Sequence, residues 1–223
     1  AIGHSDFLSP IPVLWWRAVG HTQNVFTMET LIDMVAAKAG RDPIDYRLDL
    51  LKSGTKREHE RFANVIRVVR DFSGWEKGQR RGFAASYTFG TFLAVVADVS
   101  ISEKEVHIDR MFVAVDCGTA INPDVIKAQI EGGIGYGLSA AIYSEVNFEN
   151  GVVMESNFPN YETLRINQMP KIDVKIVASA EAPGGIGEPG TPIAAPALIN
   201  ALYAKTGQRI TTLPISKSGF IFV

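Results

Sequence analysis

Four glycines inside one helical sequence pattern constrain the fold of this chain more than any other feature. The pattern is the segment DVIKAQIEGGIGYGLSAAIY, which follows Asn122 and Pro123, a capping residue and a proline typical of a helix start. Each glycine costs a helix about 1 kcal/mol relative to alanine. The glycines are Gly132, Gly133, Gly135 and Gly137. Such a helix is expected either to break or to lie very close to another backbone or a ligand.

A second glycine-rich segment lies near the end of the chain. It reads APGGIGEPGTP over residues 182–192, and seven of its eleven residues are glycine or proline. Glu188 stands between Gly187 and Pro189, where a restricted backbone holds a carboxylate that can serve as a general base. The alternative is a surface carboxylate favoured by the N-terminus of the following helix. The segment does not match the phosphate-binding pattern GxGxxG, so a plain turn is better supported than a phosphate cradle.

The first part of the chain, residues 1–80, is predicted to be mostly helical. Helices are expected from a start capped by Asn24 or Thr22 to a stop at Gly40, from 43 to 51 and from about 57 to 72. In the first of them the apolar residues recur at helical spacing and the polar residues fall on the other faces. The apolar residues are Met28, Leu31, Ile32, Val35 and Ala39, and the polar residues are Glu29, Thr30, Asp33 and Lys38.

Residues 81–223 show a mixed pattern. Strands are expected over 81–115, again at 143–154, and at 171–178, where β-branched and apolar residues alternate with polar ones. A last apolar helix is expected from about Pro196 to Thr206, with Gly207 ending it. Helices followed by strands and helices without regular βαβ alternation predict an α+β fold with mixed sheets and packed helices.

Composition excludes several classes of protein. The 223 residues carry a net charge of -2, so no basic field exists to hold a nucleic acid. The longest apolar stretches are far shorter than the eighteen or so residues of a membrane span. One cysteine, Cys117, cannot form an internal disulfide or hold an iron–sulfur cluster, and it is most simply a small buried residue. The four histidines have no ligand spacing, so no metal held by protein side chains is expected.

Two further side chains could bind a planar ligand. Gln129 lies one turn before the glycine cluster, and its amide can both donate and accept hydrogen bonds to the edge of a heterocycle. Arg17 follows two tryptophans, and its guanidinium could orient a planar or carbonyl substrate. The alternatives are an ordinary exposed glutamine and an arginine at the rim of an aromatic core.

Taken together, three segments resemble the C-terminal part of the molybdenum-binding large subunit of the xanthine dehydrogenase family. They are WWRAVGHTQN at 15–24, AVDCGTAINPDVIKAQIEGGIGYGLSAAIY at 114–143 and GGIGEPGTPIAAPALINALYAKTG at 184–207. The resemblance is closest to the branch of the isoquinoline 1-oxidoreductase β subunit and related bacterial aldehyde dehydrogenases. Family subunits are several times longer, and their N-terminal cofactor loops have no counterpart here. The resemblance implies a domain of the molybdenum-cofactor-binding type.

The resemblance also implies roles for individual residues. Glu188 matches the glutamate that acts as the catalytic base, and Arg17 matches an arginine that orients the substrate in xanthine-oxidising members. Gln129 matches a glutamine that contacts the pterin, and Gly132, Gly133 and Gly187 let the cofactor approach the backbone. Molybdenum is then held by the pterin cofactor, expected in its cytosine dinucleotide form, and no protein side chain is a metal ligand.

The resemblance implies a place in a larger enzyme. The substrate is an N-heterocycle or an aldehyde, oxidised with oxygen from water, and electrons leave through a separate iron–sulfur or cytochrome subunit. The sequence begins at Ala1 without methionine, so a processed subunit or a piece of a longer one is expected, which alone carries no cofactor and no activity. The compartment stays open between the cytoplasm and the bacterial periplasm. A rival interpretation is a non-catalytic assembly or binding domain that keeps the family fold.

Overall fold

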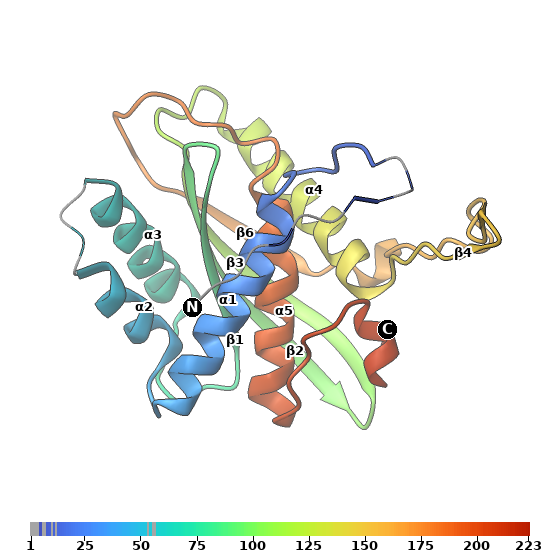
Figure 1. Ribbon diagram of the computed structural model, residues 1–223. Helices are drawn as coiled ribbons and strands as arrows, with labels where there is room; N and C mark the ends of the chain where they lie inside the picture. Colours follow the sequence, from blue (N-terminus) through green and yellow to red (C-terminus); the bar gives the residue numbers. More distant parts are fainter. Residues whose placement is uncertain (1–4, 6–7, 10, 12, 53, 55–56) are drawn as a thin grey trace.

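A mixed β-sheet forms the centre of the computed structural model (Figure 1). The model describes residues 5, 8–9, 11, 13–52, 54 and 57–223. Within this part, five strands form one sheet: β1 (Gly82–Thr88), β2 (Thr91–Ser102), β3 (Glu105–Asp116), β6 (Lys171–Ile176) and β7 (Ile221–Phe222). The first three strands are antiparallel neighbours in chain order, whereas β6 and β7 both pair with β3 in parallel.

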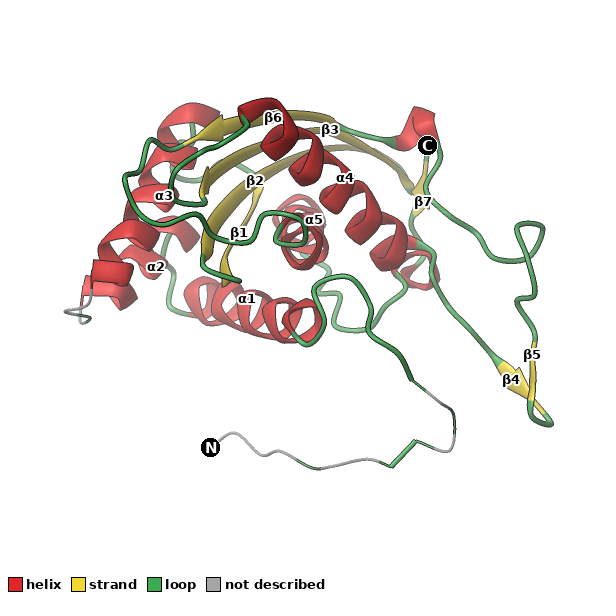
Figure 2. Ribbon diagram, turned by 90° about the horizontal axis from the view of Figure 1, so that it is seen from above, coloured by secondary structure: helices red, strands yellow, loops and turns green. Residues whose placement is uncertain are grey.

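Helices cover both faces of this sheet (Figure 2). They are α1 (His21–Lys38), α2 (Pro43–Lys52), α3 (Arg57–Ser73), α4 (Pro123–Ile142) and α5 (Gly190–Thr206), with short 3-10 helices η1 (Ile166–Gln168) and η2 (Ile215–Ser218). Alternate residues of β2 enter two different cores. Leu93 and Val95 pack in the core with α4 and α5, while Phe92 and Ala94 pack in the core with α2 and α3. The α+β class predicted from the sequence is therefore confirmed.

The strands expected over residues 143–154 are present but short: β4 (Phe148–Glu149) and β5 (Val152–Val153) pair as a small hairpin separate from the main sheet. The last helix, α5, begins at Gly190, six residues earlier than expected. Pro192 suits this start, since the first turn of a helix has no intrahelical partner for its N–H groups.

The first helix, α1, reverses the burial that its apolar spacing indicates. Its inward face carries Glu29 and Asp33, whereas Leu31 is 47% exposed. Glu29 accepts hydrogen bonds from Nε of Arg47 at 2.9 Å and from the backbone N–H of Ala85 at 2.7 Å. Burial of polar groups is tolerated when they are paired. Hydrogen bonds from residues distant in the sequence therefore determine which face of α1 is buried.

None of the helices in the described part of the chain is long and apolar enough to cross a membrane.

Candidate functional site

The glycine-rich helix α4 is continuous and packs against the start of α5. A Cβ atom added to Gly137 would lie 2.4 Å from the carbonyl oxygen of Thr191, and one added to Gly133 would lie 3.1 Å from Cα of Gly190. The expectation of a close second backbone is thus confirmed at these two positions, and the helix does not break. The contact places the residues just before α5 beside the first half of α4. A Cβ atom on Gly132, in contrast, would meet nothing within 4 Å.

The loop before α5 is fixed by backbone hydrogen bonds to the ends of two strands. The N–H of Gly184 donates to the carbonyl of Cys117 at 2.8 Å, and the N–H of Gly185 donates to the carbonyl of Phe89 at 2.7 Å. Carbon added to Gly184 would lie 2.6 Å from the carbonyl oxygen of Gly90. Glycine is therefore needed where this loop crosses the β1–β2 turn, and the loop holds Glu188 in one place.

Arg17 joins this loop to α4. Its Nε donates to the carbonyl oxygen of Gly187 at 3.0 Å, and its Nη2 donates to Oε1 of Gln129 at 3.0 Å. The next residue, Ala18, donates its backbone N–H to Oε1 of Glu188 at 2.8 Å. Residues 17, 129, 187 and 188, which the sequence singled out separately, thus form one hydrogen-bonded group. We call it the Arg17 cluster.

The backbone and an aromatic pair support the Arg17 cluster. Ala18 and Val19 have φ angles of 70° and 47°, in the left-handed region that favours glycine, and this turn aims the Ala18 N–H at Glu188. The ring of Trp16 lies 4.8 Å from that of Tyr136, and the Arg17 guanidinium lies 5.9 Å from the same tyrosine ring. Tyr136 follows Gln129 by seven residues, so both side chains lie on one face of α4.

Sequence reasoning missed Ala18 and Tyr136. No signal marks Ala18, because an alanine in a left-handed conformation looks like any other alanine. Tyr136 could have been found from its spacing of seven residues after Gln129. Of the predicted glycines, Gly187 belongs to the Arg17 cluster, and Gly133 faces Gly190 in the packing of α4 on α5.

A family model described as a molybdopterin cofactor-binding domain matches residues 22–170. The chain belongs to this family.

Three curated relatives extend the comparison. The beta chain of the isoquinoline 1-oxidoreductase of Brevundimonas diminuta is 35% identical over 94% of this chain and 28% of its own length. The membrane-bound aldehyde dehydrogenase (pyrroloquinoline-quinone) of Gluconacetobacter polyoxogenes is 30% identical over 90% of this chain and 29% of its own. A nicotinate dehydrogenase subunit of Pseudomonas putida is 29% identical over 95% of this chain and 19% of its own. The chain therefore spans less than a third of each of these relatives.

The Arg17 cluster has groups that suit a heterocyclic cofactor. Nε2 of Gln129 donates to no acceptor in the described part of the chain, and its amide lies near the exposed backbone of Gly187. Gly132, one turn further along α4, leaves open space beside the helix. Among the described residues, no group of three or more histidine, cysteine, aspartate or glutamate side chains could hold a metal. The Gln129 amide, the exposed Gly187 backbone and the open space at Gly132 fit the edge of a heterocyclic cofactor.

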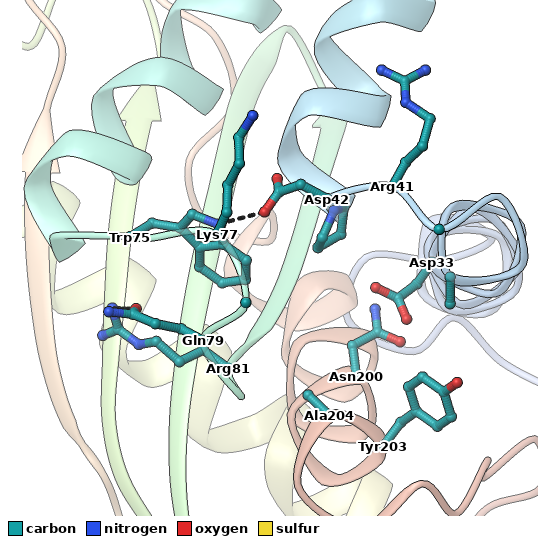
Figure 3. Close-up of a pocket in the computed structure, with 14 residues that line it drawn as sticks. Asp33, Arg41, Asp42, Trp75, Lys77, Gln79, Arg81, Asn200, Tyr203 and Ala204 are labelled. Atoms are coloured by element: carbon teal, nitrogen blue, oxygen red, sulfur yellow. Dashed lines mark hydrogen bonds between the residues drawn. The ribbon is translucent and has the colours of Figure 1, made fainter.

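A cavity of about 420 Å³ lies elsewhere, between the C-terminal halves of α1 and α5 (Figure 3). Asp33, Trp75 and Asn200 line it, and the indole Nε1 of Trp75 donates to Asp42 at 3.0 Å. Asn200 lies ten residues after Gly190, which is about 15 Å along an α-helix. This cavity therefore contains none of the residues that the sequence assigned to a site.

Proposed function

We propose that the chain is the C-terminal, cofactor-binding part of a molybdenum hydroxylase large subunit that oxidises an N-heterocycle or an aldehyde. The observation that carries the proposal is the Arg17 cluster, in which a fixed carboxylate, a guanidinium and a free amide meet in a chain of the molybdopterin-binding family. The names of two relatives refer to N-heterocycles and that of a third to an aldehyde. The substrate classes, activity and partners proposed for this chain rest on its similarity to these relatives.

Glu188 is the proposed catalytic base. Its Oε1 is held by the N–H of Ala18, while Oε2 has no hydrogen-bond partner in the described residues. A carboxylate fixed at one oxygen presents the other in a constant direction, which favours proton transfer. The molybdenum cofactor, when bound, supplies the redox centre that takes up the two electrons of substrate oxidation. Glu188 then accepts at Oε2 the proton released from the water-derived oxygen.

Arg17 and Gln129 are proposed to position substrate and cofactor. Nη1 of Arg17 has no partner among the described residues, so it can donate to a ring nitrogen or a carbonyl oxygen of the substrate. Gln129 is proposed to donate a hydrogen bond from Nε2 to the pterin. Gly132, Gly133 and Gly187 would let the pterin approach the neighbouring backbone. In this proposal the helical segment 1–80 supplies Arg17, and the segment 81–223 supplies the cofactor contacts and Glu188.

The rest of the enzyme follows from the same proposal. The cofactor is a molybdenum pterin in its cytosine dinucleotide form, and an iron–sulfur or cytochrome subunit receives the electrons. The remaining part of the large subunit completes the cofactor site, because a site that binds a cofactor normally encloses most of it.

The test uses the complete enzyme with Glu188→Gln. The amide cannot accept the proton, so we expect kcat to fall by about 10²–10⁴ while molybdenum and pterin contents stay at the wild-type level. Dye-linked oxidation of an N-heterocycle and of an aldehyde is measured beside metal and pterin analysis. Because one relative is named for pyrroloquinoline quinone, that quinone is assayed as well.

Glu181→Gln is the matched control, since Glu181 lies in the same loop but pairs with Arg57 on α3. This variant should keep kcat within about threefold of wild type, as expected for an exposed ion pair. A Glu188→Gln enzyme that also stays within threefold would contradict the assignment of the base. A complete enzyme that holds no molybdenum and oxidises neither substrate class would support the non-catalytic alternative.

A further inference from the structure

Residues 144–165 project from the body of the protein (Figures 1 and 2). They leave α4 at its C-terminus, form the β4–β5 hairpin and return to η1; we call them the arm. Large apolar side chains of the arm lie in solvent, with Phe158 80% and Val152 63% exposed. The others are Val146, Phe148, Val153 and Met154. Contiguous exposed apolar groups of this kind mark interaction surfaces.

Several polar groups of the arm, in contrast, are paired within it, and Glu145 pairs with Lys217 of η2. The backbone N–H and the side-chain Nδ2 of Asn147 donate to the carboxylate of Glu155 at 2.6 and 2.7 Å, and Asn160 donates to the carbonyl of Met154 at 2.7 Å. A two-stranded hairpin is at best marginally stable alone in water. The arm thus has a defined shape whose apolar side chains lack a covering partner.

An apolar cavity of about 340 Å³ borders the surroundings of both the Arg17 cluster and the arm. Its lining includes Trp16, the neighbour of Arg17, and Thr191 in the first turn of α5. It also includes Ser144, the first residue of the arm. The cavity therefore lies next to residues that adjoin the cluster and to the base of the arm.

We infer that the arm and this cavity bind the remaining part of the molybdenum large subunit. The inference rests on the proposed function, and the relatives' lengths, the cavity and the charge of the arm favour this occupant. More than two thirds of each relative lies outside the part that this chain matches. A polypeptide that completes a cofactor site at the Arg17 cluster would adjoin the cavity that Trp16 and Ser144 both line. The arm also has four glutamates and one arginine, so the occupant presents a basic surface to it.

The experiment places single cysteines in the complete large subunit, at Phe158→Cys and Val152→Cys. Alkylation at each position is followed by mass spectrometry of its peptide, and native Cys117 is buried. Glu60→Cys on α3 is the control, because the Glu60 side chain is also 80% exposed. We expect alkylation in the arm to be slower than at position 60 by about tenfold or more, as for groups protected by a local interface. All three positions should react at equal rates in urea.

Equal rates in the native subunit would overturn the inference. Protection that needs the redox subunit, or that disappears on dilution, would overturn it too, because the occupant would then be that subunit or a second copy. Molybdenum content and activity are measured on the same samples. An unprotected arm in an active, molybdenum-loaded subunit refutes this inference alone. A protected arm in a metal-free, inactive subunit refutes the proposed function and leaves the docking surface in place.

Discussion

Arg17 connects parts of the chain that are more than one hundred residues apart in sequence. Its guanidinium reaches Gln129 on α4 and the carbonyl of Gly187 before α5, and the adjoining Ala18 N–H holds Glu188. A guanidinium suits this role, because its planar group carries several N–H donors that point in fixed directions. The residue therefore orders the Arg17 cluster, and its Nη1 has no partner among the described residues.

Replacing Arg17 by lysine keeps the positive charge but removes the planar guanidinium and its several N–H donors. A single ammonium cannot hold Gly187 and Gln129 in the same geometry, so one or two hydrogen bonds of about 1 kcal/mol each are lost. We expect kcat/KM of the complete enzyme to fall by about 5–30-fold, which corresponds to those losses. Arg57→Lys, at an exposed position on α3, is the control and should leave kcat/KM unchanged. Equal kcat/KM values for the two variants would contradict the role of Arg17.

A second residue, Asp116 at the end of β3, makes the stability of the fold depend on pH in the acid range. Burial alone would raise the pKa of this carboxyl, but hydrogen bonds from Arg61 at 2.7 and 2.9 Å and from the N–H of Gly118 hold the pKa below its usual 3.8. The ionised form is therefore favoured in the folded state. Its contribution to stability is present above the unfolded pKa and is lost as the pH falls through the lower, folded value.

Asp116→Asn should remove this part of the acid response. In urea unfolding between pH 5 and about pH 2.5, the variant's free energy of unfolding should fall less steeply with decreasing pH than that of wild type. Arg61→Gln should give the same shallower slope, because Asp116 then loses the partner that lowers its pKa. A wild-type slope in Asp116→Asn would contradict the assignment.

Among the elements, the contact of α4 with α5 places the face of α4 that carries Gln129 beside the loop that carries Glu188. Glycine at 133 and 137 lets the two helix backbones approach, and this approach sets the position of the α5 start. The helix tolerates the low propensity of its glycines because tertiary packing, more than propensity, stabilises helices in proteins.

Gly137→Ala should separate the two helices. The added Cβ would lie 2.4 Å from the Thr191 carbonyl oxygen, so we expect the free energy of unfolding to fall by about 1–3 kcal/mol. Gly132→Ala is the matched control on the same helix, where open space lets alanine gain up to about 1 kcal/mol of helix propensity. Chemical denaturation of both variants measures the difference. Equal stabilities would show that the two helices do not need this close approach.

At the scale of the whole molecule, both faces of the sheet are packed, while one side of the Arg17 cluster is open. The two cores supply enough buried surface for a chain of 223 residues to fold alone. A cofactor bound only at this surface would make few contacts and stay hydrated, so the contacts would not offset its lost freedom.

The isolated chain is therefore expected to fold without binding molybdenum and to oxidise neither substrate class. Circular dichroism and cooperative unfolding report the fold, and elemental analysis reports the metal. Molybdenum near one atom per chain would contradict the view that the cofactor site needs the rest of the large subunit.

Features that depend on neighbouring residues could be predicted from the amino-acid sequence. Asn122 caps α4, with its side chain accepting from the N–H of Val125, and Gly207 ends α5 in a left-handed conformation, both as predicted. Short-range caps and alternation act within a few residues and can be read directly. The α+β class followed from such signals, whereas the family followed from the resemblance of the segments at 15–24, 114–143 and 184–207.

Features that depend on contacts between residues far apart in the sequence could be learned only from the tertiary structure. The inward polar face of α1 rests on Arg47 and Ala85, and the start of α5 at Gly190 rests on its packing against α4. The meeting of Arg17, Gln129 and Glu188 likewise depends on contacts across the chain. Spacing along a sequence cannot show these pairings, because their energies arise only when the folded chain brings the groups together.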